Sequence, residues 1–92
     1  MSTLEPRRFR IINMRGLHAR ASAKFVRCVE TYDAEVTVTK DGQSVGGTSI
    51  MGLMMLAASP GCCIDVSATG NEAEAALDAL ETLIENRFGE ET

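Results

Sequence analysis

The chain has 92 residues, which is enough for one modest hydrophobic core and too few for two, so we expect a single domain over residues 1–92. Its 45% hydrophobic and 24% charged residues are typical of globular proteins and exclude a disordered or fibrous chain. The apolar run 50–58 is too short to cross a bilayer and the first ten residues lack the apolar core of a signal peptide, so we expect no membrane insertion and a cytoplasmic location.

Basic and acidic residues are unevenly distributed along the chain, whose net charge is -4. No acidic residue occurs between Glu5 and Glu30, and this interval holds seven of the nine basic residues. The pattern indicates a site for an anion or an acidic partner, with chance clustering on solvated faces as the alternative. Because few aromatic residues accompany the basic ones, we expect no nucleic-acid binding.

The first half of the chain predicts a strand, a helix and a β-hairpin. Residues 7–13 are rich in β-branched and aromatic side chains, which favours a strand, and apolar residues recur at helical spacing over 18–31. Residues 34–40 alternate as in a half-exposed strand. The Asp-Gly pair at 41–42 predicts a two-residue turn, after which the chain returns as a short strand over 43–45.

The next segment predicts a short helix and a strand. Thr48 or Ser49 can cap an apolar helix over 50–58, which the Pro-Gly pair at 60–61 ends. Residues 62–68 alternate again. The side chains expected to face the core from this strand are Cys62, Ile64, Val66 and Ala68.

A final helix is predicted after residue 70. Asn71 followed by Glu74 resembles a capping box, and an apolar stripe at helical spacing runs from Ala73 to Phe88. The resulting order is βαββαβα. It predicts an α+β fold in which the helices cover one face of a mainly antiparallel sheet.

The three cysteines indicate neither a disulfide framework nor a metal site. Cys28, Cys62 and Cys63 form no C-x-x-C pair, and we expect reduced thiols. Because the chain has one histidine, it lacks enough ligands at workable spacing for zinc. We therefore expect no metal and no cofactor.

The single histidine, His18, lies at the head of the first predicted helix. If His18 caps that helix, the N–H groups of Ala19, Arg20 and Ala21 point toward its ring and form an anion site, to which Arg15 and Arg20 add positive charge. Positive surroundings disfavour the imidazolium form and leave a ring nitrogen free to attack phosphorus. No carboxylate is near in the sequence, so we expect a site without an internal acid-base pair.

Other interpretations of this segment remain open from the residues alone. A lone histidine near a helix end is ordinarily structural or exposed. Serine or cysteine nucleophile chemistry is disfavoured, because the chain has no G-x-S-x-G elbow and Cys28 lies ten residues further on. The alternatives are a binding module that recognises acidic ligands or proteins without covalent transfer, and a small regulatory domain that binds a metabolite.

Two motifs resemble those of a known family. The segment RGLHARASAKFV (15–26) is similar to the phosphorylation site of HPr, the histidine phosphocarrier of the phosphoenolpyruvate-dependent phosphotransferase system. The segment TSIMGLMML (48–56) resembles the second signature of that family, around its regulatory serine. The resemblance covers residues 9–88 and implies an open-faced β-sandwich with four antiparallel strands and three helices.

The resemblance also implies a function and its residues. His18 would take a phosphoryl group on Nδ1 from phosphorylated enzyme I and pass it to a IIA-type acceptor, in sugar uptake or in a nitrogen-related phosphorelay. Such a protein is a carrier and not an enzyme. Arg20 matches the arginine that contacts the phosphoryl group, and Ser49 matches the serine that an HPr kinase/phosphorylase modifies in some bacteria. Ala21 stands where the family commonly has proline, and it adds one amide donor to the first turn.

The predicted partner surface combines the basic helix with the apolar one. Methionines suit a surface that accepts several partners in turn, although ordinary core packing is an equal alternative for any one of them. We expect a monomer. The residues predicted to contact partners are Leu17, Lys24, Arg27, Met51, Leu53 and Met54.

Overall fold

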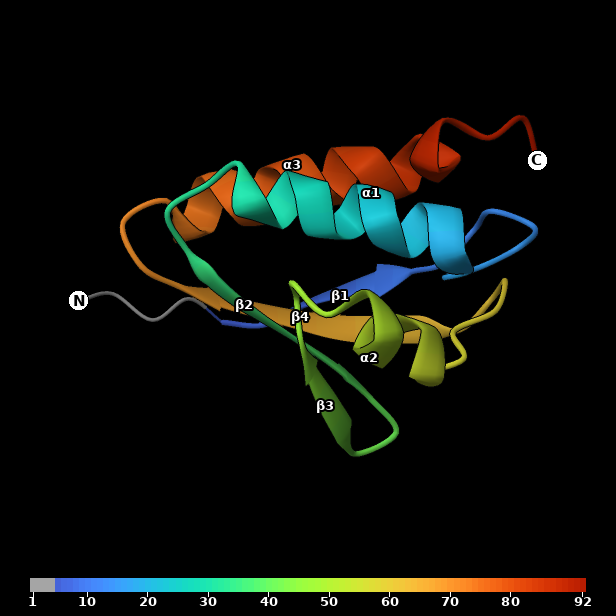
Figure 1. Ribbon diagram of the computed structural model, residues 1–92, viewed down its shortest axis with the longest axis horizontal. Helices are drawn as coiled ribbons and strands as arrows, with labels where there is room; N and C mark the ends of the chain where they lie inside the picture. The colour runs from blue at the N-terminus through green and yellow to red at the C-terminus, as the bar shows by residue number, and fades with distance from the viewer. Residues whose placement is uncertain (1–4) are drawn as a thin grey trace.

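The structure is a computed structural model that describes residues 5–92. Two of its helices lie side by side over one face of a four-stranded antiparallel sheet, and a short third helix lies beside them (Figure 1). The predicted α+β architecture is therefore confirmed. The elements in chain order are β1 (Arg7–Arg10), α1 (Ala19–Glu30), β2 (Glu35–Lys40), β3 (Gln43–Gly46), α2 (Ile50–Met55), β4 (Cys63–Thr69), α3 (Ala73–Glu85) and a 3-10 turn (Arg87–Gly89).

The sheet has the strand order β1-β4-β2-β3, so β1 and β3 are its edges. The predicted hairpin forms between β2 and β3, and its turn residues Asp41 and Gly42 have φ angles of 51° and 81°. Both values are positive, as a type I′ turn requires. The central pair β2–β4 sets Val38 opposite Val66, and both side chains are fully buried beneath the helices.

The core lies between this sheet and the helices. The alternating strand patterns place one side chain in two toward the helices, and α1 and α3 each bury the apolar stripe that their spacing predicts. Cys62 precedes β4 and is only half-buried, although its side chain packs against the core. The largest fully buried apolar side chains are Phe25, Phe88, Ile11, Leu53, Ile64, Leu77 and Leu80.

Two predicted details of the last helix are wrong. Its N-cap is Glu72, and the Asn71 side chain instead donates to Asp33 Oδ2 at 3.2 Å, so no capping box forms at Asn71. The helix ends at Glu85, before Phe88, which is buried in the 3-10 turn with a φ of 55°. After this turn the C-terminal residues run on past the end of α3, at the side of the molecule where α1 begins (Figure 1).

Within residues 5–92, no helix is long and apolar enough to cross a membrane. All three cysteines are free thiols. In the same part of the chain, no group of three or more histidine, cysteine, aspartate or glutamate side chains is placed to hold a metal ion.

Candidate functional site

His18 is the N-cap of α1, as predicted. Its backbone is extended, with φ -73° and ψ -179°, and its carbonyl accepts the first helical hydrogen bond from the N–H of Ser22 at 2.8 Å. The N–H groups of Ala19, Arg20 and Ala21 precede that bond, so the helix itself supplies no acceptor for them. The end of α1 therefore presents backbone donors, and the positive end of the helix dipole, beside the His18 backbone.

The loop before His18 is held in place by the segment that follows α2. Gly16 has a φ of 61°, and its N–H donates to the Asn13 carbonyl at 3.1 Å. The N–H of Leu17 donates to the carbonyl of Ala58 at 2.9 Å. The Leu17 side chain is only 4% exposed, so its prediction as a partner-binding residue is wrong. Leu17 anchors the loop and presents no surface.

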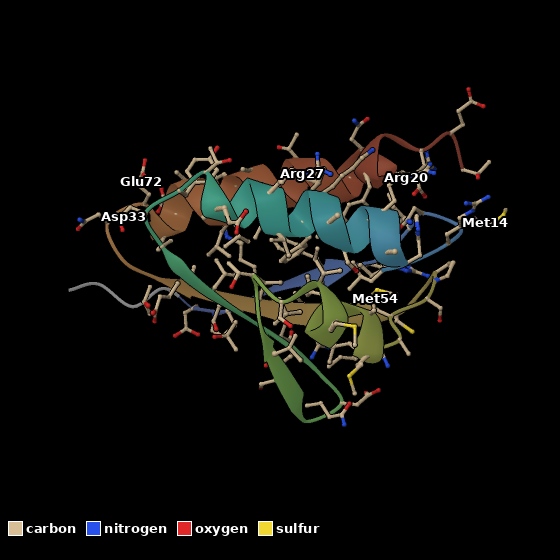
Figure 2. The ribbon with its side chains drawn as sticks, in the orientation of Figure 1. Met14, Arg20, Arg27, Asp33, Met54 and Glu72 are labelled. Carbon is tan, nitrogen blue, oxygen red and sulfur yellow. The ribbon has the colours of Figure 1, made fainter. Side chains whose placement is uncertain are left out.

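Three cationic side chains lie near the start of α1. Arg15, Arg20 and Lys24 line a small polar pocket together with Glu90 from the C-terminal segment. Figure 2 shows Arg20 at the end of the molecule where that segment finishes. Arg15 and Arg20 are exposed, so their guanidinium groups can reach an anion at the helix end.

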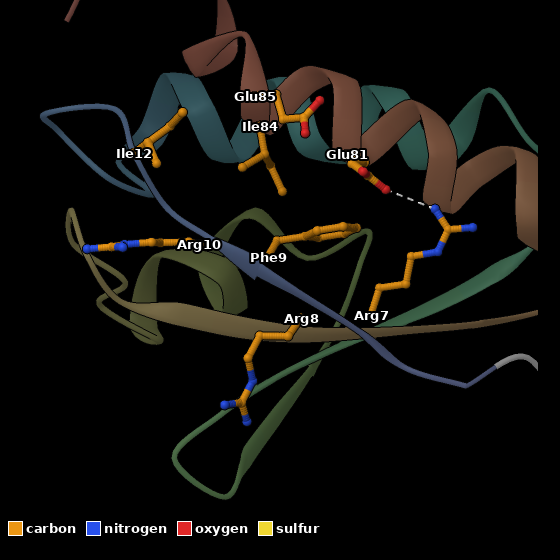
Figure 3. Close-up of a pocket in the computed structure, with 8 residues that line it drawn as sticks. All are labelled: Arg7, Arg8, Phe9, Arg10, Ile12, Glu81, Ile84 and Glu85. Atoms are coloured by element: carbon orange, nitrogen blue, oxygen red, sulfur yellow. Dashed lines mark hydrogen bonds and ion pairs between the residues drawn. The ribbon is translucent and has the colours of Figure 1, made fainter.

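Two other arginines of the basic interval, Arg7 and Arg8, lie away from His18. Arg7 pairs with Asp78 at 2.7 Å and with Glu81 at 3.1 Å, and Arg8 pairs with Asp65 at 3.0 Å. Arg7 and Arg8 also line a groove between β1 and α3, away from His18, where Figure 3 shows the Arg7–Glu81 contact. The basic residues that are clustered in the sequence therefore do not all lie together in the structure, since Arg7 and Arg8 pair with acidic side chains.

A carboxylate lies at the imidazole, contrary to the prediction. Glu90 Oε2 contacts His18 Nε2, and Glu90 Oε1 accepts a hydrogen bond from Asn13 Nδ2 at 3.0 Å. The His18 side chain is 24% exposed and that of Glu90 is 15% exposed, so water competes only partly for the contact. No sequence pattern indicates Glu90, because 72 residues separate it from His18. None indicates Asn13 either, because its side chain is connected to the ring only through Glu90.

Several contacts determine the ionisation of Glu90. Burial by itself raises the pKa of this carboxyl, but hydrogen bonds from Asn13 and His18, together with the nearby charge of Arg15, outweigh it. The pKa of Glu90 is therefore below its ordinary value. The Glu90 carboxylate therefore stabilises the fold at pH values above the pKa that Glu90 has in the unfolded chain. This stabilisation is lost as the pH falls through the lower pKa that Glu90 has in the folded protein. Glu90 is thus a carboxylate at neutral pH.

The short helix α2 provides a second patch of exposed apolar residues. Ser49 is its N-cap, and the Ser49 hydroxyl accepts the N–H of Gly52 at 2.9 Å. Met51 is 71% exposed and Met54 is 40% exposed, and Figure 2 shows Met54 on α2. Leu53 is fully buried, so its prediction as a partner-binding residue is wrong.

Replacement of Leu53 tests this assignment to the core. We expect Leu53→Ala to lower the free energy of unfolding by about 2–5 kcal/mol, because it leaves a cavity in a closed core. Met51→Ala removes an exposed side chain and should change that free energy by less than about 0.5 kcal/mol. Urea unfolding measures both changes. Equal losses in the two variants would contradict the burial of Leu53.

Comparison with known proteins assigns the family. Residues 6–86 match the family described as "PTS HPr component phosphorylation site". The chain belongs to the HPr family. The phosphocarrier protein HPr of Neisseria meningitidis serogroup A is 50% identical over 87% of this chain and 90% of its own length. The phosphocarrier protein NPr of Shewanella violacea is 38% identical over 98% of both chains.

The solved structures agree with this assignment. The HPr of Thermoanaerobacter tengcongensis has a TM-score of 0.91 and 40% identity, and the alignment covers 97% of this chain and all of the other. The HPr family consists of phosphocarriers, which are phosphotransfer intermediates and not catalysts, and this chain is one of them. The matched residues 6–86 include His18.

Proposed function

We propose that His18 Nδ1 is the atom that carries the phosphoryl group. The position of His18 as the N-cap of α1, with three N–H groups ahead of the helical hydrogen bonds, is the observation that supports this most strongly. Arg15 and Arg20 are placed to neutralise the added charge. Because Glu90 occupies Nε2, Nδ1 is the ring nitrogen that remains for attack on phosphorus.

The transfer needs no metal or cofactor from this chain. The lone pair of Nδ1 forms a bond to phosphorus, and the bond between phosphorus and the donor breaks. The donor keeps that electron pair. The ring retains its proton on Nε2 and becomes a cation, while the N–H groups of α1 and the Arg20 guanidinium bind the phosphoryl oxygens. Passing the group to an acceptor reverses these bond changes.

The partners in this proposal are phosphorylated enzyme I as donor and a IIA-type protein as acceptor. The surface offered to them has exposed methionines on α2 and the exposed Arg27 on α1. Flexible methionine side chains can fit more than one partner. Lys24 contributes less freely, because its Nζ donates to the Phe88 carbonyl at 2.6 Å. The relay can serve sugar uptake or a regulatory, nitrogen-related pathway.

Labelling with phosphoenolpyruvate tests the proposal. The protein is incubated with enzyme I and labelled phosphoenolpyruvate, and the modified residue is located by mass spectrometry under neutral conditions. We expect acid-labile phosphate on His18 that a IIA protein then removes. Label on another residue, or binding of phosphate without a covalent bond, would contradict the assignment and favour a binding module.

We propose in addition that a phosphate on Ser49 weakens docking on enzyme I. Ser49 is exposed at the start of α2, and a phosphoryl group there brings nearly two negative charges beside the methionine patch. The Ser49→Asp variant should raise the KM for phosphoryl uptake about tenfold, which corresponds to about 1.4 kcal/mol of docking free energy.

The matched control for that variant is Ser49→Asn. Asparagine and aspartate cap a helix about as well as serine, so the two variants differ in charge and not in capping. Steady-state uptake from enzyme I measures both. If Ser49→Asn raises the KM as much as Ser49→Asp, the effect comes from the altered side chain and the proposed electrostatic regulation is wrong.

A further inference from the structure

The C-terminal segment is attached to the phosphorylation site at several points. Lys24 Nζ donates to the Phe88 carbonyl at 2.6 Å, and the Met14 N–H donates to the Thr92 carbonyl at 3.1 Å. Between these two attachments, the Glu90 side chain bridges Asn13 and His18. Figure 1 shows this segment ending beside the loop that precedes α1. Glu90 is therefore held at the imidazole by the fold.

We propose that Glu90 is a positioning residue that keeps the His18 ring oriented, with its proton on Nε2, for phosphoryl transfer. A carboxylate at Nε2 accepts a hydrogen bond only when that nitrogen carries a proton, and in the neutral ring this tautomer leaves the Nδ1 lone pair free. This inference rests on the proposed phosphorylation of His18. It adds to the anion site a group that acts on the opposite nitrogen of the ring.

Asn13 holds Glu90 in turn. Its side chain is fully buried, and Nδ2 donates both to the Gly16 carbonyl at 2.9 Å and to Glu90 Oε1 at 3.0 Å. These two donated bonds determine which way the amide faces. The hydrogen-bonded series Asn13–Glu90–His18 thus connects the loop before α1 to the imidazole ring through the C-terminal segment. In such an arrangement a third group orients the one that touches the reactive side chain.

The burial of Phe88 explains how an end segment can hold this position. Arg87 and Phe88 both have positive φ angles, 54° and 55°, which non-glycine residues rarely adopt. The Phe88 side chain is 1% exposed within the core, and its burial offsets the cost of that backbone. Two residues later the chain brings Glu90 to the imidazole. The segment is therefore part of the fold and not a loose end.

The bond changes explain how Glu90 favours transfer. When Nδ1 binds phosphorus, the ring becomes a cation with its proton still on Nε2. The carboxylate then faces a positive ring, and its hydrogen bond gains strength in the transition state and in the phosphorylated form. A neutral side chain at position 90 would not form this stronger hydrogen bond to the positively charged ring. The expected loss is about tenfold in the rate of uptake, typical of one hydrogen bond to a charged group.

Two variants and one spectroscopic measurement test the proposal. Glu90→Gln keeps the shape of the side chain and removes its charge, and Glu74→Gln removes the same charge from an exposed position in the first turn of α3, outside the pocket that Arg15 and Arg20 line. We expect kcat/KM for uptake from phosphorylated enzyme I to fall about tenfold in Glu90→Gln and to stay within about twofold of the unmodified protein in Glu74→Gln. Equal rates in the two variants would overturn the role of Glu90.

The tautomer of His18 can be measured without the phosphoryl donor. Because the chain has one histidine, the ¹⁵N shifts of its two ring nitrogens report the tautomer without ambiguity. We expect the Nε2–H form in the unmodified protein and a mixture of both tautomers in Glu90→Ala. An unchanged tautomer in Glu90→Ala would refute the proposal. If enzyme I fails to phosphorylate the unmodified protein, the proposed function fails, and the tautomer still decides whether Glu90 orients the ring.

Discussion

The His18→Gln variant is expected to accept no phosphoryl group from phosphorylated enzyme I, with uptake at least about a thousandfold below that of the unmodified protein. Glutamine can fill the space at the head of α1 and can donate to Glu90, but its amide nitrogen has no lone pair available for bonding to phosphorus. The three N–H groups of the first turn and the arginines remain in place. The loss therefore isolates the nucleophile from its anion-binding surroundings.

The stability of that variant is the control. His18 is an N-cap without a side-chain capping bond, so its replacement removes no cap, and glutamine can keep a hydrogen bond to Glu90. We expect a change of about 1 kcal/mol or less in the free energy of unfolding, measured in urea. Phosphate uptake by the folded His18→Gln protein would show that another residue carries the group. Unfolding of the variant would show that His18 has a structural role instead.

Much of the fold could be predicted, because short-range patterns determine it. The alternation in β2 and β4 and the Asp-Gly pair between β2 and β3 specify strands and a hairpin locally. Phe88 was misplaced because an apolar residue at helical spacing satisfies the pattern equally well in a following turn. Asn71 was misplaced because its amide has a competing acceptor in Asp33, from a distant part of the chain.

The site divides in the same way between local and distant contacts. His18 and the donors of the first turn lie within a few residues of one another, so the sequence could predict them. Glu90 reaches the ring because α3 ends at Glu85 and the left-handed turn at Phe88 places the segment that follows it beside His18. Leu17 and Leu53 are apolar residues of the kind found at interfaces, but both side chains are buried in the core. Apolar character alone does not distinguish a docking surface from a buried anchor.

The Gly16→Ala variant is expected to lose about 3 kcal/mol of stability, as overpacking at a close contact does, together with most of its phosphoryl uptake. A Cβ at this position would lie 2.2 Å from the Ala58 carbonyl oxygen and 3.0 Å from Ser59 Cα, and the φ of 61° is itself unfavourable for alanine. The loop must therefore move away from the segment after α2. That movement would weaken the 2.9 Å hydrogen bond of Leu17 to Ala58 and displace His18.

Gly42→Ala separates the two causes of this loss. Gly42 has a φ of 81°, but nothing lies within 4 Å of a Cβ placed there, so alanine meets only the backbone cost of about 1 kcal/mol. Uptake should be normal in Gly42→Ala and about a hundredfold slower in Gly16→Ala, because a shift of about 1 Å in a reacting group has an effect of that size. Equal losses of stability with normal uptake in both variants would mean that the contact at Ala58 does not position His18. The predicted difference instead makes the packing of the loop against Ala58 a requirement for the chemistry at the head of α1.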